Sequence, residues 1–338
     1  MNKYKFKTPL NKNYFFGYYD KSPLSLDGSK HLALEVDFLD HLPTKKDEAR
    51  IGYFDLKKND NIFYYITTTK TFNWQQGCML QWFGDKNNQI IYNDLVDNKF
   101  VSIIYDIKTK EKTILPMAIY TLSSDNKFAL CIDNERHYFI RRGYSYDGVS
   151  NDDKNKDIVE NDGIFLLDIE NQDVKKVIDM NEMIKNKPLA NMKDGIHYLE
   201  HLMISVDNKK VAFFHRWKLI DGGIHTRLYT AKIDGRDIFL INDSGRMSHF
   251  CWNYNNQIFG WGGVPNTINS LRKYKNIVKF VIKPLLPLYK KLVSGNAIDG
   301  TSKISSLVTG DSYILFNDKS SSKSKVSLDS APVRKTEL

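Results

Sequence analysis

The sequence predicts an all-β fold: a β-propeller with about five recognisable four-stranded blades, either closing at five or forming part of a larger propeller. A turn centred on Asp or Asn recurs five times, and a short apolar run follows each turn. Such turns tolerate the positive φ angles of tight hairpins. A repeat of roughly 50 to 80 residues with four short strands is typical of a propeller blade. The turns are expected at residues 25–28, 84–87, 124–127, 205–208 and 253–256.

The blades follow one another along the chain. In each blade, the run before the turn is expected to form the innermost strand and the run after it the second strand. A third strand ends in Asp followed by Leu or Ile, as in Asp55-Leu56 and Asp106-Ile107. The five blades are expected at residues 14–69, 71–116, 119–180, 198–242 and 247–328, within one domain covering residues 1–338 that ends in a polar tail at 329–338.

Composition limits the class of protein. Aromatic residues make up 13% of the 338 residues, which suits strands packed face to face, and three cysteines without paired spacing argue against a disulfide framework. No apolar signal segment or membrane-spanning run is recognisable, so a cytoplasmic location is expected. The net charge is +9, and seven basic residues with no acidic one lie between Val264 and Ile298. The rest of the chain is therefore nearly balanced in charge, which does not favour binding to nucleic acid.

One end of the predicted propeller carries all the long connections, at residues 37–50, 141–162, 218–224 and 264–301. Loops gathered on one face of a rigid scaffold usually display a binding site, although tolerated insertions are the alternative. Polar and aromatic residues gather at the same end, beside the central channel. They include Tyr18, Tyr19, Trp74, Gln76, His197, Glu200, His201, His215, Arg216, Trp217 and His249.

These residue types suit an acidic sugar. Histidine can accept a proton or bind a metal, arginine holds a carboxylate, and exposed aromatic rings stack on sugar faces. The turn at Asp207 places His201 across a hairpin from Phe214 and His215, so His201, His215 and Arg216 are expected to lie close together. Each histidine alone could equally be a structural hydrogen-bonding residue.

Two stretches, 201–217 with its His-Arg-Trp end and 22–31, resemble repeats of oligogalacturonate lyase and related propellers encoded with bacterial surface-polysaccharide genes. The strand at 248–252, Ser-His-Phe-Cys-Trp, shares the likeness. This resemblance implies that His201 and Arg216 are catalytic and that His215 and His249 bind a divalent metal such as manganese. Tyr18, Tyr19, Trp74, Gln76, Trp217 and Arg246 are then the expected substrate-binding residues.

A basic insertion at 264–300 interrupts the fifth predicted blade. Apolar residues at helical spacing between Leu271 and Lys283 predict an amphipathic helix. Such a helix fits an anionic membrane surface, with packing onto the propeller as the alternative. The expected membrane contacts are Arg272, Lys275, Lys279 and Lys283.

The sequence therefore predicts a cytoplasmic protein, peripheral on the inner membrane, that acts on or binds an acidic, uronate-containing glycan, free or lipid-linked. As an enzyme it would be a lyase working by β-elimination. A non-catalytic propeller that recognises glycans or serves as a scaffold in surface-polysaccharide assembly is the alternative, because the chain ends after five repeats whereas the lyases it resembles continue through further blades.

Overall fold

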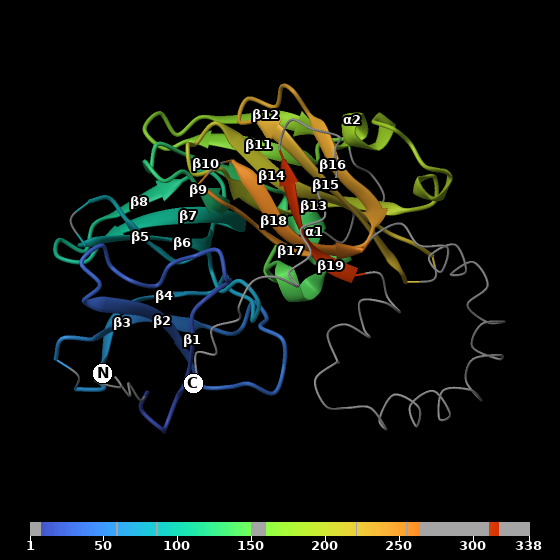
Figure 1. Cartoon of the computed structure of the whole chain (residues 1–338). Coiled ribbons are helices and arrows are strands. Elements are labelled where there is room, and N and C mark those ends of the chain that lie inside the picture. Colours follow the sequence, from blue (N-terminus) through green and yellow to red (C-terminus); the bar gives the residue numbers. More distant parts are fainter. Residues whose placement is uncertain are drawn as a thin grey trace, which may run out of the picture. The chain divides into compact units, whose positions relative to one another are not determined.

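The computed structural model describes residues 8–58, 60–85, 87–149, 160–220, 222–254, 256–263 and 311–317. These residues form an all-β protein built from antiparallel sheets that follow one another in sequence, which is the blade arrangement of a β-propeller (Figure 1). The predicted fold class is therefore confirmed. The chain separates into two compact units, one comprising residues 1–223 and 231–238 and the other 224–230 and 239–338.

The first unit contains three complete four-stranded sheets, each ordered as a simple up-and-down meander. They coincide with the first three predicted blades. The first sheet is β1 (Asn13–Phe15), β2 (Lys30–Val36), β3 (Ala49–Asp55) and β4 (Phe63–Thr69). The second is β5 (Gln81–Phe83), β6 (Gln89–Val96), β7 (Lys99–Asp106) and β8 (Lys112–Leu115), and the third is β9 (Ile119–Leu122), β10 (Phe128–Cys131), β11 (Gly163–Asp168) and β12 (Val174–Asp179).

The first unit also contains the hairpin formed by β13 (Ile196–Ile204) and β14 (Lys210–Lys218). Strand β13 contacts β9, so the first strands of two successive predicted blades are neighbours. In the second unit, β15 (Ile224–Lys232) pairs with β16 (Phe239–Gly245). Strands β17 (Met247–Trp252), β18 (Gln257–Gly263) and β19 (Asp311–Asn317) form a three-stranded sheet. The basic insertion at 264–300 and the tail at 329–338 lie outside the described residues.

The predicted turns adopt the backbone that their residue types favour. Each turn contains a residue with positive φ, which glycine and asparagine accept more readily than other residues, and the turn at 84–87 contains a second one, Gly84. The third turn closes from Ser123 to Asn126, one residue earlier than predicted. Besides Gly84, the positive-φ residues of these turns are Gly28, Asn87, Asn126, Asn208 and Asn256.

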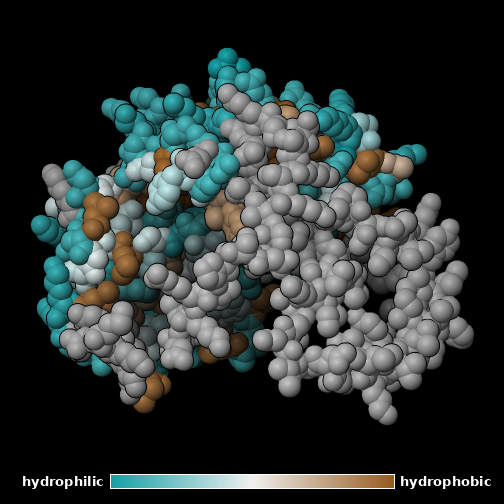
Figure 2. All heavy atoms as spheres, in the orientation of Figure 1, coloured by the Kyte–Doolittle hydropathy of each residue, from teal (hydrophilic) through white to brown (hydrophobic). Residues whose placement is uncertain are grey.

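Buried aliphatic and aromatic side chains join the first two sheets into one core. Leu32, Leu34 and Ile51 from the first sheet are fully buried with Ile90 and Tyr92 from the second. Burying a side chain of this kind contributes about 1.5–3 kcal/mol, so the core holds these sheets face to face. In the view of Figure 2 the described surface is mostly hydrophilic, with separate hydrophobic residues.

Two short helices that the sequence pattern did not predict connect strands in the first unit. Helix α1 (Asn134–Ile140) begins after Asp133, whose side chain accepts a hydrogen bond from the Arg136 backbone N–H. Helix α2 (Met180–Lys185) is capped in the same way by Asp179. Short 3₁₀ turns follow at Arg142–Tyr144 and Ala190–Met192. No helix among the described residues is long and apolar enough to cross a membrane.

A buried ion pair ties α1 to its neighbours. The Arg136 guanidinium binds the Asp162 carboxylate and donates a hydrogen bond of 2.6 Å to the His197 carbonyl oxygen. Burial raises the pKa of Asp162 to about 6, although Arg136 opposes the shift. Since this value exceeds the unfolded-state pKa of about 3.9, Asp162 favours folding below pH ~4 and that contribution disappears as the pH rises through 6.

Asp162→Asn is therefore expected to flatten the pH dependence of stability. Between pH 4 and 7 the wild-type protein should lose about 2–3 kcal/mol more unfolding free energy than the variant, because a two-unit pKa shift is worth that amount. Urea unfolding across this range measures it. Asp97→Asn, in an exposed hairpin turn, is the control. Equal pH slopes for wild type and Asp162→Asn would show that Asp162 titrates normally.

Candidate functional site

A buried carboxylate lies at the centre of the candidate site. Glu200, on β13, is 0% exposed, and its Oε1 accepts hydrogen bonds from Nη1 of both Arg141 and Arg216. His137 Nε2 lies 3.4 Å from Oε2. Burial alone would raise the pKa of Glu200, but Arg216 and His201 outweigh it and hold the pKa well below its usual range. Two guanidinium groups therefore share one carboxylate, and the cluster carries excess positive charge.

His201 joins this cluster because β13 contains a bulge. The pairing of β13 with β14 shifts between Glu200 and Met203, and His201 has a φ of 55°. A bulge places two residues of one strand opposite a single residue of its partner, which interrupts the alternation of side chains, so two consecutive side chains can lie on the same face of the sheet. His201 Nδ1 consequently lies 3.5 Å from Glu200 Oε1. Positive φ in a residue other than glycine is uncommon, and such strain is concentrated at functional sites.

The other ring nitrogen of His201 faces a phenol. Its Nε2 lies 2.9 Å from the Tyr18 hydroxyl. Burial lowers the pKa of His201 despite the opposing effect of Glu200, so the imidazole is neutral at pH 7. Nδ1 makes no hydrogen bond among the described residues, and in the tautomer that carries its proton on Nδ1 the Nε2 atom accepts the hydrogen bond from the Tyr18 hydroxyl. Burial also raises the pKa of Tyr18. Glu200, His201 and Tyr18 thus form a carboxylate–imidazole–hydroxyl series.

Aromatic rings and an amide surround this series. The Arg141 guanidinium lies 3.8 Å from the centre of the Tyr144 ring, and that ring is 5.8 Å from the His201 ring. The Tyr120 hydroxyl, on β9, accepts hydrogen bonds of 2.8 Å from the His201 backbone N–H and from Gln76 Nε2. Gln76 Oε1 is buried and has no hydrogen-bond partner among the described residues. Residues from four predicted blades, among them Tyr18, Gln76 and Tyr120, therefore meet around His201.

The structure brings together four of the sequence-predicted site residues: Tyr18, Gln76, His201 and Arg216. Tyr19 lies beside them, with its ring centre 4.5 Å from that of Tyr18 and half of its surface exposed. Tyr19 is thus the most accessible aromatic ring at this position.

Two predicted residues of the same hairpin face the other way. Side chains alternate across a strand, so His215 and Trp217 lie on the sheet face opposite Arg216. There His215 Nε2 is 2.9 Å from Nδ1 of His197, and Trp217 stacks against His197. The predicted proximity of His215 to His201 and Arg216 is therefore replaced by a His197–His215 pair.

The remaining predicted residues lie elsewhere. Trp74 packs among Phe15, Phe38 and Phe72, and its indole N–H donates to the His41 carbonyl oxygen. In the second unit, Arg246 lies over the Trp261 ring and His249 contacts the Ser248 hydroxyl. The membrane-contact residues Arg272, Lys275, Lys279 and Lys283 are outside the described residues.

The predicted metal ligands, His215 and His249, belong to different units. His215 uses Nε2 in the contact with His197. Among the described residues no group of three or more His, Cys, Asp or Glu side chains is arranged to hold a metal ion. Manganese remains an expectation from the sequence resemblance.

Sequence reasoning gave no role to five residues of the cluster. Glu200 and Arg141 carry its charge, and both left a signal: Glu200 directly precedes His201, and Arg141 begins the long connection at 141–162. No sequence pattern distinguishes the others, because their role depends on packing between sheets. They are His137, Tyr120 and Tyr144.

No protein-family model and no curated protein matches this sequence. Solved structures similar to it include tricorn protease, at 12% identity over 76% of this chain and 20% of that one, with a TM-score of 0.41. Oligogalacturonate lyase from Vibrio parahaemolyticus is similar at 12% identity over 75% and 72%, with a TM-score of 0.37. The β-propeller domain of the Trilobed protease from Pyrococcus furiosus is similar at 11% identity over 75% and 65%, with a TM-score of 0.41. Likenesses this weak carry no argument about what the chain does.

Proposed function

We propose that the Glu200–His201 cluster binds an acidic, uronate-containing glycan. The observation that carries this proposal is the pairing of one buried carboxylate with two guanidinium groups beside a neutral histidine. A buried cluster with excess positive charge is stabilised by an incoming anion. Arg141 is the group positioned to meet it, because its side chain is 22% exposed whereas that of Arg216 is 7% exposed.

The same geometry supports β-elimination as the reaction. Arg141 would neutralise the uronate carboxylate and so acidify the neighbouring C5–H bond. The Tyr18 oxygen would take the C5 proton while its own proton passes to His201 Nε2, 2.9 Å away. A C4–C5 double bond forms as the C4–O bond breaks, and the departing oxygen receives a proton through Tyr18. Glu200 would stabilise the imidazolium that forms in between.

Recognition without turnover is the second candidate. It is favoured by burial, since Glu200 is fully enclosed and His201 is 7% exposed. A fixed, charged and aromatic-lined site can bind an acidic sugar without any proton transfer. The two candidates differ in one product: only a lyase generates an unsaturated uronate.

Calorimetric titration with trigalacturonate and with neutral maltotriose tests the shared proposal. The acidic trisaccharide is expected to bind, and Arg141→Met should weaken that binding about tenfold or more through loss of a charge-assisted hydrogen bond. Arg142→Met is the matched control, because Arg142 is exposed and lies over Tyr138 instead. Equal affinity for both sugars, or equal effects of the two substitutions, would contradict the proposal. Ultraviolet absorbance of the unsaturated product then separates lyase from recognition protein.

A further inference from the structure

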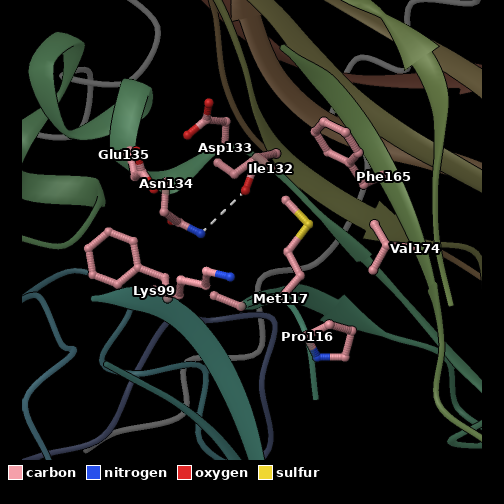
Figure 3. Close-up of a pocket in the computed structure, with 11 residues that line it drawn as sticks. Lys99, Pro116, Met117, Ile132, Asp133, Asn134, Glu135, Phe165 and Val174 are labelled. Atoms are coloured by element: carbon pink, nitrogen blue, oxygen red, sulfur yellow. Dashed lines mark hydrogen bonds between the residues drawn. The ribbon is translucent and has the colours of Figure 1, made fainter. Parts of the chain in front are cut away.

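A pocket lies in the first unit, between the sheets of the second and third predicted blades. Its volume is about 450 Å³, within the range of pockets that hold small organic molecules. It shares no residue with the Glu200–His201 cluster. Its walls come from the start of β7, the β8–β9 connection, the β10–α1 junction and strands β11 and β12 (Figure 3).

Most of the pocket wall is apolar. Phe100, Met117, Ile132 and Phe165 line the space, and Figure 3 shows Val174 at its margin. Val174 is 41% exposed, so the pocket opens to solvent on that side. Two aromatic rings and a thioether form a surface that suits an aromatic or alkyl group.

The wall is held in place by neighbouring contacts. The Phe100 ring packs on Tyr146 at 5.7 Å, and the Phe100 carbonyl accepts a hydrogen bond of 3.1 Å from the Ala118 N–H. The Met117 carbonyl accepts a hydrogen bond of 3.0 Å from the Ser102 hydroxyl. The pocket is therefore part of the packed sheets rather than of a loop alone.

Two hydrogen-bond donors enter this apolar space. Lys99 begins β7 directly after the tight turn at Asp97 and Asn98, both at positive φ. Its ammonium group points into the pocket in Figure 3 and has no side-chain partner among the described residues. The Ser145 hydroxyl donates a hydrogen bond of 3.3 Å to Asn134 Oδ1, so that Asn134 Nδ2 points toward Lys99 (Figure 3). Asn134 Nδ2 also donates a long hydrogen bond of 3.4 Å to the Ile132 carbonyl oxygen.

Two carboxylates, those of Asp133 and Glu135, also line the pocket. The Asp133 side chain accepts a hydrogen bond from the Arg136 backbone N–H and so caps α1. Figure 3 shows this side chain turned away from the centre of the pocket. No ion pair joins Lys99 to either Asp133 or Glu135. A cationic ligand is the competing possibility that these carboxylates raise, and it is included in the test below.

We propose that this pocket binds an amphipathic carboxylic acid. Its apolar body would lie between Phe100, Met117 and Phe165, and its carboxylate would accept hydrogen bonds from Lys99 Nζ and Asn134 Nδ2. The two hydrogen-bond donors, Lys99 Nζ and Asn134 Nδ2, select the acid over a neutral or cationic analogue of the same shape. This site goes beyond the proposed glycan function and does not depend on it.

The Met117 methyl group allows a direct test. The full chain, labelled with ¹³C at the methionine methyl groups, is titrated with 4-phenylbutyrate, 4-phenylbutanol and 4-phenylbutylamine, and the Met117 signal is assigned with Met117→Leu. Phenylbutyrate is expected to shift that signal saturably, with the alcohol and the amine each binding about tenfold more weakly or worse.

Two variants and a control complete the test. Lys99→Met should weaken phenylbutyrate binding about tenfold or more and leave phenylbutanol unaffected, and Val174→Trp should block both by filling the opening. Lys108→Met, a change of the same type in an exposed turn of the same sheet, should have no effect. Absence of a saturable shift, equal binding of the three probes, preference for the amine, or equal effects of Lys99→Met and Lys108→Met would each overturn the proposal.

Discussion

Glu200→Gln is expected to destabilise the protein by about 3–5 kcal/mol, because removing one partner of a buried ion pair leaves uncompensated charge in the interior. Glutamine keeps the size and one acceptor oxygen of the native side chain, so the loss isolates the charge. The Arg216 side chain is almost fully buried, while that of Arg141 is partly exposed. The repulsion between these two guanidinium groups adds to the cost.

Urea unfolding measures this loss. Glu111→Gln, at an exposed turn where the carboxylate meets the Thr109 hydroxyl, is the control and should stay within about 0.5 kcal/mol of wild type. Adding Arg216→Met to Glu200→Gln should recover part of the stability, because it removes the more deeply buried of the two positive charges beside position 200. Equal stability of Glu200→Gln and wild type would mean that the carboxylate does not hold the two arginines together.

His201→Asn is expected to lower turnover of an acidic oligosaccharide by about 10²-fold or more, the usual contribution of a positioned proton-transfer group. Asparagine is preferred to alanine because it tolerates the positive φ at this position, whereas alanine would add backbone strain to the measurement. Tyr18→Phe should have a similar effect, since it removes the hydroxyl at 2.9 Å from the imidazole.

His31→Asn provides the control for that experiment. Like His201, His31 has its pKa lowered mainly by burial, but it lies on β2 against Phe16. It should retain wild-type turnover. Glycan binding that survives in His201→Asn, with no turnover in the wild-type protein, would assign the site to recognition. Loss of folding in His201→Asn with unchanged ligand binding per folded molecule would assign His201 to structure.

Local sequence determined the strands and turns of this protein. Gly28 and Asn208 occupy positions of positive φ, a requirement of the backbone that one residue can satisfy by itself. The apolar runs that follow pair antiparallel because the turns between them are too short for any other connection. The first three predicted blades therefore coincide with observed sheets. Helices α1 and α2 were missed because six or seven residues are too few to show a helical period.

The tertiary structure decided which side chains form the site. Counting residues across the turn at Asp207 assumes an uninterrupted ladder, but the bulge after Glu200 changes the face of His201 while His215 keeps its alternation. Arg141 and Tyr120 reach the cluster from other parts of the chain, and nothing in the local pattern encodes that approach. Turn chemistry is a property of single residues and can be predicted from sequence, whereas the bulge and the arginine pairing depend on how separate sheets pack against one another.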